Sequence, residues 1–267
     1  MTDITNKTIW LTGASAGIGE ALAYALAAQD ARLILSARRR EQLEAVRSRC
    51  ANPERHLIVP FDMGDAAAVQ AAVGQVKQIG RPVDLLINNA GLSQRALAQD
   101  TALEVDRRLM EVNYFGALAL TKALLPEMLA RRSGHIVTVT SLVGIFGSPV
   151  RSGYAASKHA LHGFFDSLRA EVAPEGVVVT LVCPGFIRTE VSVHALMGNG
   201  KPQGTMDAAQ TAGMAPEQCA AAILAAIRHN RAEVVIGGRE TWGVWLSRWF
   251  PSLFRRLIGR VNVTRPV

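Results

Sequence analysis

The chain alternates short, mainly apolar runs with longer stretches in which apolar residues recur every three or four positions. Seven runs rich in Val, Ile and Leu predict buried strands at 8–12, 32–36, 56–60, 83–87, 135–140, 177–182 and 233–236. Ala-rich amphipathic stretches between them predict helices at 17–28, 39–50, 65–79, 104–130, 153–172 and 216–229. Strands that are apolar throughout are buried on both faces, and alternation with helices is typical of a parallel sheet covered on each side. The pattern predicts a three-layer α/β fold with a doubly wound, parallel, seven-stranded sheet.

Two segments interrupt this alternation. Residues 190–214 are rich in Gly, Met and Ala without a clear period, and we interpret them as a lid over a substrate. Residues 238–267 are aromatic and Arg-rich, and we interpret them as a C-terminal amphipathic helical extension. Because nothing between residues 6 and 237 has the composition of a linker, we predict a single catalytic domain over 1–237.

Composition excludes several classes of protein. The 267 residues are 49% hydrophobic and 19% charged, which excludes a disordered, collagen-like or coiled-coil chain. Cys50, Cys183 and Cys219 lie far apart, and no histidine pair has the spacing and carboxylate company of a zinc site, so we expect neither disulfides nor a metal. The first residues lack the features of a signal peptide, and no 18-residue apolar run occurs. These observations lead us to expect a cytoplasmic protein.

The first predicted strand leads into a glycine-rich turn and then a helix. The turn reads Thr12-Gly13-Ala14-Ser15-Ala16-Gly17-Ile18-Gly19. Glycines let the backbone approach a pyrophosphate, which then lies at the N-terminus of the helix, where free N–H groups and the helix dipole favour anions. The alternative is an ordinary turn between strand and helix. We interpret Gly13, Ser15, Gly17, Ile18 and Gly19 as cofactor-binding residues of a Rossmann-type domain.

The end of the second strand bears on which dinucleotide is bound. It reads Ser36-Ala37-Arg38-Arg39-Arg40, with no acidic residue before Glu41. An acidic group at this point suits the ribose 2′-hydroxyl of NAD, whereas a guanidinium suits the 2′-phosphate of NADP. A solvated basic helix start is the alternative, although arginines oppose the positive end of the dipole there. We therefore predict NADP(H), with Arg38 and Arg39 near the phosphate.

Three residues predict the reacting groups. Ser141 follows the fifth strand, and Tyr154 and Lys158 share one face of the next helix because they are four residues apart. A tyrosine with a pKa near 10 is a poor base at neutral pH, and a neighbouring ammonium stabilises its phenolate. Ser141 would then orient a substrate oxygen. By itself a Tyr-x-x-x-Lys pair is a weak motif, and its weight comes from its position after a Ser-terminated strand.

With these motifs the sequence closely resembles the short-chain dehydrogenase/reductase family. The matching segments are Thr12–Gly19, Asp62, Asn88-Asn89-Ala90-Gly91, Asn113, Ser141, Tyr154 to Lys158, and Pro184-Gly185 followed by Thr189.

The resemblance implies a role for each matching residue. Tyr154 would be the general acid/base, Lys158 would lower its pKa and bind the nicotinamide ribose, Ser141 would position the carbonyl, and Asn113 would hold a water in a proton relay. Asp62 and Asn89 would frame the adenine side, and Ala90 and Gly91 would also bind the cofactor. Ile187 and Thr189, after Pro184 and Gly185, would hold the carboxamide.

For single members of this set, a purely structural role is the alternative. Asn113 would merely bond a backbone kink, Asn88 to Gly91 would be a polar turn, and Asp62 would be a helix cap. The resemblance further implies a homodimer or homotetramer that pairs through the helices carrying Asn113 and Tyr154. The joint occurrence of Asp62, the Asn88–Gly91 segment and Asn113 in the family's order favours the functional interpretation of these residues.

The predicted substrate region is apolar. The segment after Ser141 contains Val143 and Phe146, the segment after Gly185 begins with Phe186, and the predicted lid carries Met197. With Ser141 and Tyr154 these are our candidate substrate residues, and they favour a hydrophobic carbonyl or alcohol. The alternative is that the apolar side chains only pack the lid onto the body.

The C-terminal extension combines apolar and basic residues. From 242 to 261 apolar residues recur at helical spacing, with arginines between them, and Pro251 is expected to begin a second helix. Residues 239–267 hold six Arg and one Glu, so they supply +5 of the chain's net charge of +7. Such a stripe suits packing on the body or a second subunit, or contact with a membrane surface. Nucleic acid is not expected, because no recognition motif is present.

Taken together, the sequence predicts an NADP(H)-dependent oxidoreductase acting on a hydrophobic carbonyl or alcohol, in the direction of reduction. The alternative is a non-catalytic NADP-binding sensor or scaffold, which the extension would attach to a membrane. Such proteins commonly lack the Tyr or the Lys, whereas this chain has both Tyr154 and Lys158.

Overall fold

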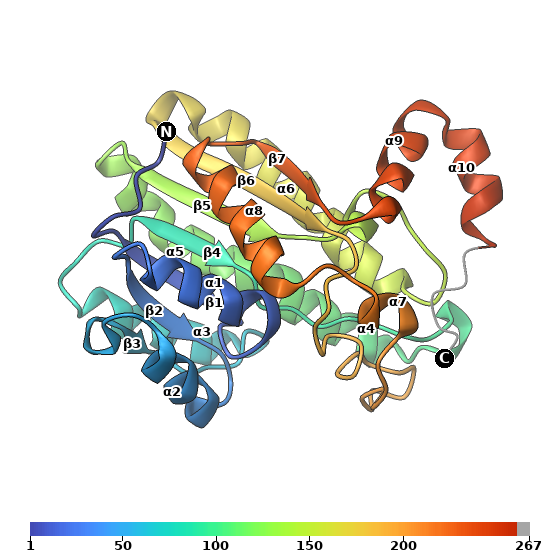
Figure 1. Cartoon of the computed structure of the whole chain (residues 1–267), viewed down its shortest axis with the longest axis horizontal. Helices are drawn as coiled ribbons and strands as arrows, with labels where there is room; N and C mark the ends of the chain where they lie inside the picture. Colours follow the sequence, from blue (N-terminus) through green and yellow to red (C-terminus); the bar gives the residue numbers. More distant parts are fainter. Residues whose placement is uncertain (261–267) are drawn as a thin grey trace.

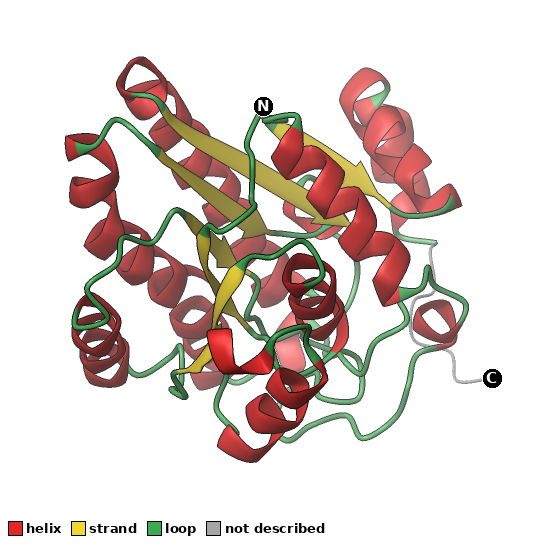
Figure 2. Ribbon diagram, turned by 60° about the vertical axis from the view of Figure 1, so that its left-hand side comes forward, coloured by secondary structure: helices red, strands yellow, loops and turns green. Residues whose placement is uncertain are grey.

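Seven parallel strands form one twisted sheet between two layers of helices (Figures 1 and 2). This computed structural model describes residues 1–260. The strands are β1 (Thr8–Thr12), β2 (Arg32–Ser36), β3 (Leu57–Ile58), β4 (Leu85–Asn88), β5 (Gly134–Val139), β6 (Val177–Pro184) and β7 (Glu233–Ile236). They lie side by side in the order β3-β2-β1-β4-β5-β6-β7, and every neighbouring pair is parallel. The predicted single-domain α/β fold with a doubly wound sheet is confirmed.

The helices follow the predicted segments closely. They are α1 (Gly17–Ala27), α2 (Arg40–Arg49), α3 (Ala66–Lys77), α4 (Leu103–Met110), α5 (Gly116–Ala130), α6 (Ser152–Val172), α7 (Ala208–Thr211), α8 (Pro216–Arg228), α9 (Trp242–Trp249) and α10 (Pro251–Ile258). One prediction needs correction, because the helix expected over 104–130 is divided. A π-helical turn at Glu111–Phe115 separates α4 from α5.

Side chains alternate between two hydrophobic cores on the two faces of the sheet. On β1, Ile9 and Leu11 point to one core while Trp10 points to the other. The first core is closed by α1, α2 and α8, and the second by α3, α5 and α6. Successive side chains of a strand point to opposite faces, so a strand buried on both must be apolar throughout. This is why the strands read as continuous apolar runs.

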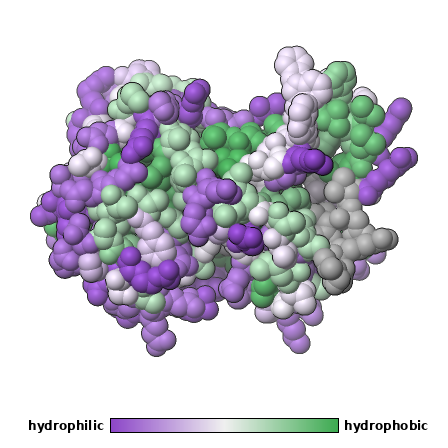
Figure 3. Space-filling view, in the orientation of Figure 1, coloured by the Kyte–Doolittle hydropathy of each residue, from purple (hydrophilic) through white to green (hydrophobic). Residues whose placement is uncertain are grey.

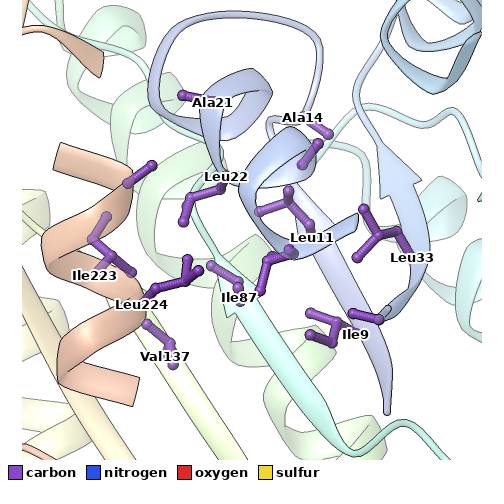
Figure 4. Close-up of a cluster of buried hydrophobic side chains, with 14 of the residues drawn as sticks. Ile9, Leu11, Ala14, Ala21, Leu22, Leu33, Ile87, Val137, Ile223 and Leu224 are labelled. Carbon is purple, nitrogen blue, oxygen red and sulfur yellow. The ribbon is translucent and has the colours of Figure 1, made fainter. Parts of the chain in front are cut away.

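Residues from the two ends of the chain meet in the first core (Figure 4). Leu22 of α1 lies beside Ile223 and Leu224 of α8, over Ile87 of β4 and Val137 of β5. Leu22, Ile223, Ile87 and Val137 have no measurable solvent exposure. The helix after the glycine turn is therefore held in place by a helix near the C-terminal end of the domain.

Strand β3 is shorter than the predicted 56–60. Its ladder with β2 covers Leu57 and Ile58, although Val59 still donates to the carbonyl of Leu35. Pro60 has no N–H to donate, and proline is confined to strand edges and ends. This strand lies at the edge of the sheet, where the missing bond costs least.

The two irregular segments differ in structure. Residues 190–214 contain only the short α7 and isolated bridges such as Gln94 with Leu196. The extension forms α9 and α10, and Pro251 is the first residue of α10, as predicted. Its last seven positions, 261–267, with the last predicted apolar position Val261, lie outside the described residues. Among residues 1–260, no helix is long and apolar enough to cross a bilayer.

The buried His135 predicts a loss of stability in mild acid. Its ring nitrogens lie 3.2 Å from Thr2 Oγ1 and 2.9 Å from Thr180 Oγ1, and burial lowers the pKa of His135 to about 4. Between pH 6.5 and 4 the unfolded chain therefore binds a proton that the folded chain excludes. The free energy of unfolding has its full value above pH 6.5 and decreases as the pH is lowered toward 4. We expect this to remove about 3 kcal/mol of unfolding free energy.

Urea unfolding at a series of pH values measures this effect. A His135→Gln variant should lose that part of the acid dependence, and the exposed His229→Gln variant should behave as the parent. Parallel stability curves for the parent and His135→Gln would show that the ring does not resist protonation.

Candidate active site

The candidate site lies where the strands end. The carboxyl ends of parallel strands meet at one edge of the sheet, and the chain reverses its winding direction between β1 and β4, which is where such sheets bind ligands. A cavity of about 660 Å³ opens there. All seventeen predicted cofactor residues line it: Gly13, Ser15, Gly17, Ile18, Gly19, Arg38, Arg39, Asp62, Asn89, Ala90, Gly91, Tyr154, Lys158, Pro184, Gly185, Ile187 and Thr189.

The glycine turn has no room for side chains. Gly13 has a φ of +65°, and a Cβ there would lie 2.8 Å from the Cα of Ala90. A Cβ at Gly19 would collide with the carbonyl oxygen of Gly13, and one at Gly17 would approach Thr189 to 2.9 Å. The bare backbone and the free N–H groups at the start of α1 form a cradle that suits a pyrophosphate. The residues present therefore fit a dinucleotide.

The turn is fastened to the segment after β4. The Thr12 hydroxyl accepts hydrogen bonds from the N–H groups of Asn89 and Ala90, at 3.0 and 3.1 Å. The Asn89 amide donates in return to the carbonyl oxygens of Thr12 and Gly13. Asn89 thus acts on the cavity through the glycine turn. The polar turn at Asn88–Gly91 that we considered as an alternative is therefore present, and it is hydrogen-bonded to the glycine turn.

The far end of the cavity is basic. Arg38 and Arg39 are exposed at its rim, and among residues 1–260 neither forms an ion pair. Asp62 is different, because Arg108 donates to its carboxylate at 2.6 Å. Burial raises the pKa of Asp62, but the Gly64 N–H and Arg108 outweigh burial and hold that pKa below its usual range. Arg108 lines the cavity too, although the sequence offered no motif around it.

Ser141, Tyr154 and Lys158 meet at the opposite end. Ser141 Oγ donates to the Pro184 carbonyl at 3.4 Å and accepts from the Val143 N–H at 3.3 Å, and Lys158 Nζ lies 5.8 Å from the centre of the Tyr154 ring. Lys158 is buried and donates to the Val139 carbonyl at 2.9 Å. Burial raises the pKa of Tyr154, against the opposing effects of Ser141, Arg151 and Arg95. Burial also lowers the pKa of Lys158 to about 8.

Asn113 lies in the π-helical turn and does not line the cavity. Its side chain accepts from the Leu92 N–H at 2.7 Å and donates to the Leu92 carbonyl and to Ser157 Oγ, each at 2.9 Å. These bonds join the helix distortion to the segment that follows the Asn88–Gly91 turn. π-helical turns often occur at functional sites. The side chain is thus used in the way that our structural alternative describes, and its relay role stays a prediction.

The structure adds an ionic cluster that the sequence analysis did not identify. Asp207 lies within hydrogen-bonding distance of the Arg95 guanidinium, at 2.7 Å, and 3.8 Å from Arg151, and all three side chains are buried. Arg95 also donates to Ser93 Oγ, and Ser93 lines the cavity. The cluster joins the segment after β4, the predicted lid and the residue that precedes α6. It therefore connects the lid to the helix that carries Tyr154.

The predicted substrate residues separate into two groups. Ser141 and Tyr154 line the cavity, whereas Val143, Phe146, Phe186 and Met197 do not. Phe146 packs against Phe254 of α10 with ring centres 4.9 Å apart, and Phe186 lies beneath the guanidinium of Arg151. Met197 is partly exposed on the lid. For Phe146 and Phe186 the observed packing matches the alternative in which apolar residues hold neighbouring segments together.

A second polar cluster lies behind the site. His162, Cys183 and Glu233 bring their side chains together, although they come from α6, β6 and β7. One ring nitrogen of His162 lies 3.0 Å from Thr140 Oγ1 and 3.7 Å from Cys183 Sγ, while the other lies 4.0 Å from Glu233. Because the two nitrogens face different partners, the His162 ring connects strands β6 and β7. Our expectation that the protein holds no metal stays a prediction.

Comparisons with known proteins show which family this chain is similar to. The family model described as short chain dehydrogenase matches residues 7–197. A protein of Anopheles gambiae named dehydrogenase/reductase SDR family protein 7-like is 43% identical over 260 residues, which cover 94% of this chain and 81% of that protein.

Two solved structures are also similar. A short chain dehydrogenase from Burkholderia cenocepacia in complex with NADP has a TM-score of 0.78 at 30% identity and covers 96% of this chain and 99% of its own. A short chain dehydrogenase/reductase from Burkholderia phymatum in complex with NAD has a TM-score of 0.82 and covers 100% and 99%. Its 22% identity shows a common fold alone.

Proposed function

Since this chain is a member of the short-chain dehydrogenase/reductase family, we propose that it transfers a hydride between NADP(H) and a hydrophobic carbonyl or alcohol, with Tyr154 as general acid/base. Membership itself makes the protein an oxidoreductase of a family that binds nicotinamide dinucleotides. The observation that carries the proposal is that Ser141, Tyr154 and Lys158 line the same cavity as the glycine turn.

The chain's own residues supply the proton and the orientation. A bound nicotinamide dinucleotide would supply or accept the hydride. Ser141 and Tyr154 line the same cavity, and their hydroxyls would present two donors to a carbonyl oxygen. Tyr154 would protonate that oxygen as negative charge develops on it. The buried Lys158 ammonium then stabilises the phenolate that remains.

The protonation of Tyr154 supports reduction as the direction. Burial raises the pKa of Tyr154, so its phenol carries a proton at neutral pH in the free site. A protonated phenol is the form that a carbonyl reductase needs, because the first transfer to oxygen is from acid to substrate. The oxidation of an alcohol would need phenolate first.

The basic rim supports NADP(H) over NAD(H). Arg38 and Arg39 lie at the end of β2, where a 2′-phosphate would be met, and the one carboxylate nearby, Asp62, is paired with Arg108. The Burkholderia cenocepacia relative, at 30% identity, was solved in complex with NADP. A guanidinium is also the group best suited to fork onto a phosphate.

Replacing Arg38 by aspartate tests the cofactor preference. The variant loses a charge-assisted contact, worth about 1.5–3 kcal/mol, so the NADPH Michaelis constant is expected to rise about 10- to 100-fold while that for NADH changes little. Arg40→Asp is the matched control, because Arg40 does not line the cavity. Steady-state kinetics with both cofactors measure the ratio. Equal changes for NADPH and NADH in Arg38→Asp would contradict the assignment.

An NADPH-consumption screen tests the reaction and the substrate class. Ketones, aldehydes, quinones and 3-oxoacyl thioesters would be offered, with Tyr154→Phe as the blank. We expect turnover of at least one apolar carbonyl that the blank does not show.

No observation favours the non-catalytic sensor or scaffold, because Tyr154, Lys158 and Ser141 are all present in one cavity. A homodimer or homotetramer and a cytoplasmic location stay predictions.

A further inference from the structure

Exposed apolar side chains gather on α9 and α10. Here six large ones form what we call the aromatic patch: Trp242, Trp245, Trp249, Phe250, Leu253 and Leu257. The Trp242 and Trp249 rings are each 70% exposed, more than any other large hydrophobic residue of the described chain except Met1. In Figure 1 the two helices lie together at one end of the molecule, beyond the end of β7. Exposed apolar surface of this kind marks a contact site more often than a free surface.

The patch is continuous. Trp242, Trp245 and Trp249 follow helical spacing on one face of α9, Leu253 and Leu257 follow helical spacing on α10, and Phe250 lies between the two helices. The rings of Trp242 and Trp245 are 6.2 Å apart, and Trp245 lies 5.4 Å from Phe250. The last contact joins the two rows into one surface.

The other face of the helix pair is fixed to the domain. Val244 and Phe254 are buried, and Phe254 packs against Phe146. The Glu240 carboxylate accepts the N–H groups of Phe186 and Gly238, both at 3.0 Å. Arg248 forms an ion pair with Glu233 of β7 at 2.6 Å. The patch is therefore held outward by a packed base, and the helices have no need of the patch to stay in place.

Charge decides which partner this surface fits. Residues 242–260 contain Arg248, Arg255, Arg256 and Arg260 and no acidic residue. Figure 3 shows green hydrophobic surface beside purple hydrophilic atoms at this end of the molecule. Within the described chain, Arg255, Arg256 and Arg260 form no ion pair, whereas Arg248 does. Three cations thus lie on α10 or directly after it without a carboxylate to balance them.

A second copy of the chain fits this surface poorly. In a two-fold contact the same patch meets itself, which would bring the three arginines of one copy toward those of the other. Nothing acidic within 242–260 is available to offset that repulsion. A bilayer that contains anionic phospholipids supplies negative headgroups for the arginines and an interfacial layer for the rings, where Trp is favoured.

We propose that the aromatic patch binds the surface of an anionic phospholipid bilayer, with the six apolar side chains of the patch in the interfacial layer and Arg255, Arg256 and Arg260 on the headgroups. This goes beyond the proposed oxidoreductase activity, and its test does not depend on turnover. Vesicle binding and catalysis can therefore fail independently of one another.

Flotation of the full-length chain with vesicles tests the proposal. Vesicles of phosphatidylcholine alone and of phosphatidylcholine with 30% phosphatidylserine would be compared at low and at high salt. We expect the protein to float with the anionic vesicles at low salt, and salt to weaken that binding because the arginine contribution is screened. Failure to float with anionic vesicles at low salt would overturn the proposal.

Two variants separate the rings from the charges. Trp242→Ser/Trp249→Ser removes the two most exposed rings and leaves Val244 and Phe254 in place, so folding is preserved. Arg255→Glu/Arg256→Glu reverses two charges. Each is expected to lower the vesicle partition coefficient at least tenfold, since one basic residue near an anionic surface contributes about fivefold.

Matched controls change the same properties elsewhere. Leu97→Ser/Leu103→Ser removes two exposed apolar side chains near α4, and Lys77→Glu/Arg81→Glu reverses two exposed charges near α3. Both should float as the parent does. If all four variants float equally, the patch is not the membrane contact. If light scattering shows that Trp242→Ser/Trp249→Ser converts a dimer to a monomer while the parent ignores vesicles, the occupant is a second copy and the proposal is wrong.

Discussion

Replacing Tyr154 by phenylalanine is expected to lower kcat for carbonyl reduction by about 10²- to 10⁴-fold, the range that a positioned proton donor contributes. The variant keeps the ring, which lines the cavity, and loses only the hydroxyl. The ring would still occupy its place between Ser141 and Lys158. Proton donation to the substrate oxygen would be lost, while the glycine turn and the Arg38 rim stay as they are.

Single-turnover kinetics and a separate NADPH titration measure the two effects. The dissociation constant of NADPH should stay within about twofold of the parent's value, because the hydroxyl acts in the transition state and does not contribute to cofactor binding. Tyr24→Phe is the control, because Tyr24 lies on α1 and its hydroxyl donates to Glu20, away from the cavity. A Tyr154→Phe enzyme that keeps more than a tenth of the parent's kcat would show that another group donates the proton.

Replacing Asp207 by asparagine is expected to destabilise the fold by about 3–5 kcal/mol, as breaking a buried ion pair does. Arg95 and Arg151 are both buried, and Asp207 is the carboxylate that each of them contacts in the described chain. Asparagine keeps the shape and can still accept from Gln203, so the change removes mainly the charge. Two buried guanidinium groups would then face one another without a counterion.

Urea unfolding measures this loss, and Asp166→Asn is the control. Asp166 pairs with Arg169 at the surface, where such a pair contributes less than about 1 kcal/mol. Adding Arg95→Met to Asp207→Asn should restore part of the stability, because one unpaired charge is removed. If Asp207→Asn unfolds at the same urea concentration as the parent, the cluster does not hold the lid to the domain.

Elements fixed by local pattern were predictable from the sequence. A strand that leads into Gly13, Gly17 and Gly19 can only place its turn at the carboxyl edge of the sheet, and the other strand ends lie at that same edge. The end of β2 predicted Arg38 at this edge, and the resemblance to the family assigned Asn89 and Thr189; all three line one cavity. Helix ends followed for a similar reason, as Pro251 at the first position of α10 illustrates.

Features that depend on long-range contacts were not predictable. The π-helical turn has no marker in the apolar period, since it is stabilised by Asn113 and the backbone of Leu92 on another segment. Asp207 and Arg95 are 112 positions apart, and neither stands in a motif. The apolar period did not show which partner Phe146 packs against, because the position of α10 follows from tertiary packing.

The packing of α1 against α8 has a consequence during synthesis of the chain. The apolar face of α1, with Leu22, is closed by Ile223 and Leu224, which are made about 200 residues later. At about 5–20 residues per second, that face waits on the order of 10–40 s for its partner. The nucleotide-binding half cannot complete its core until α8 has left the ribosome. Exposure of α1 in nascent chains is therefore built into the order of the elements.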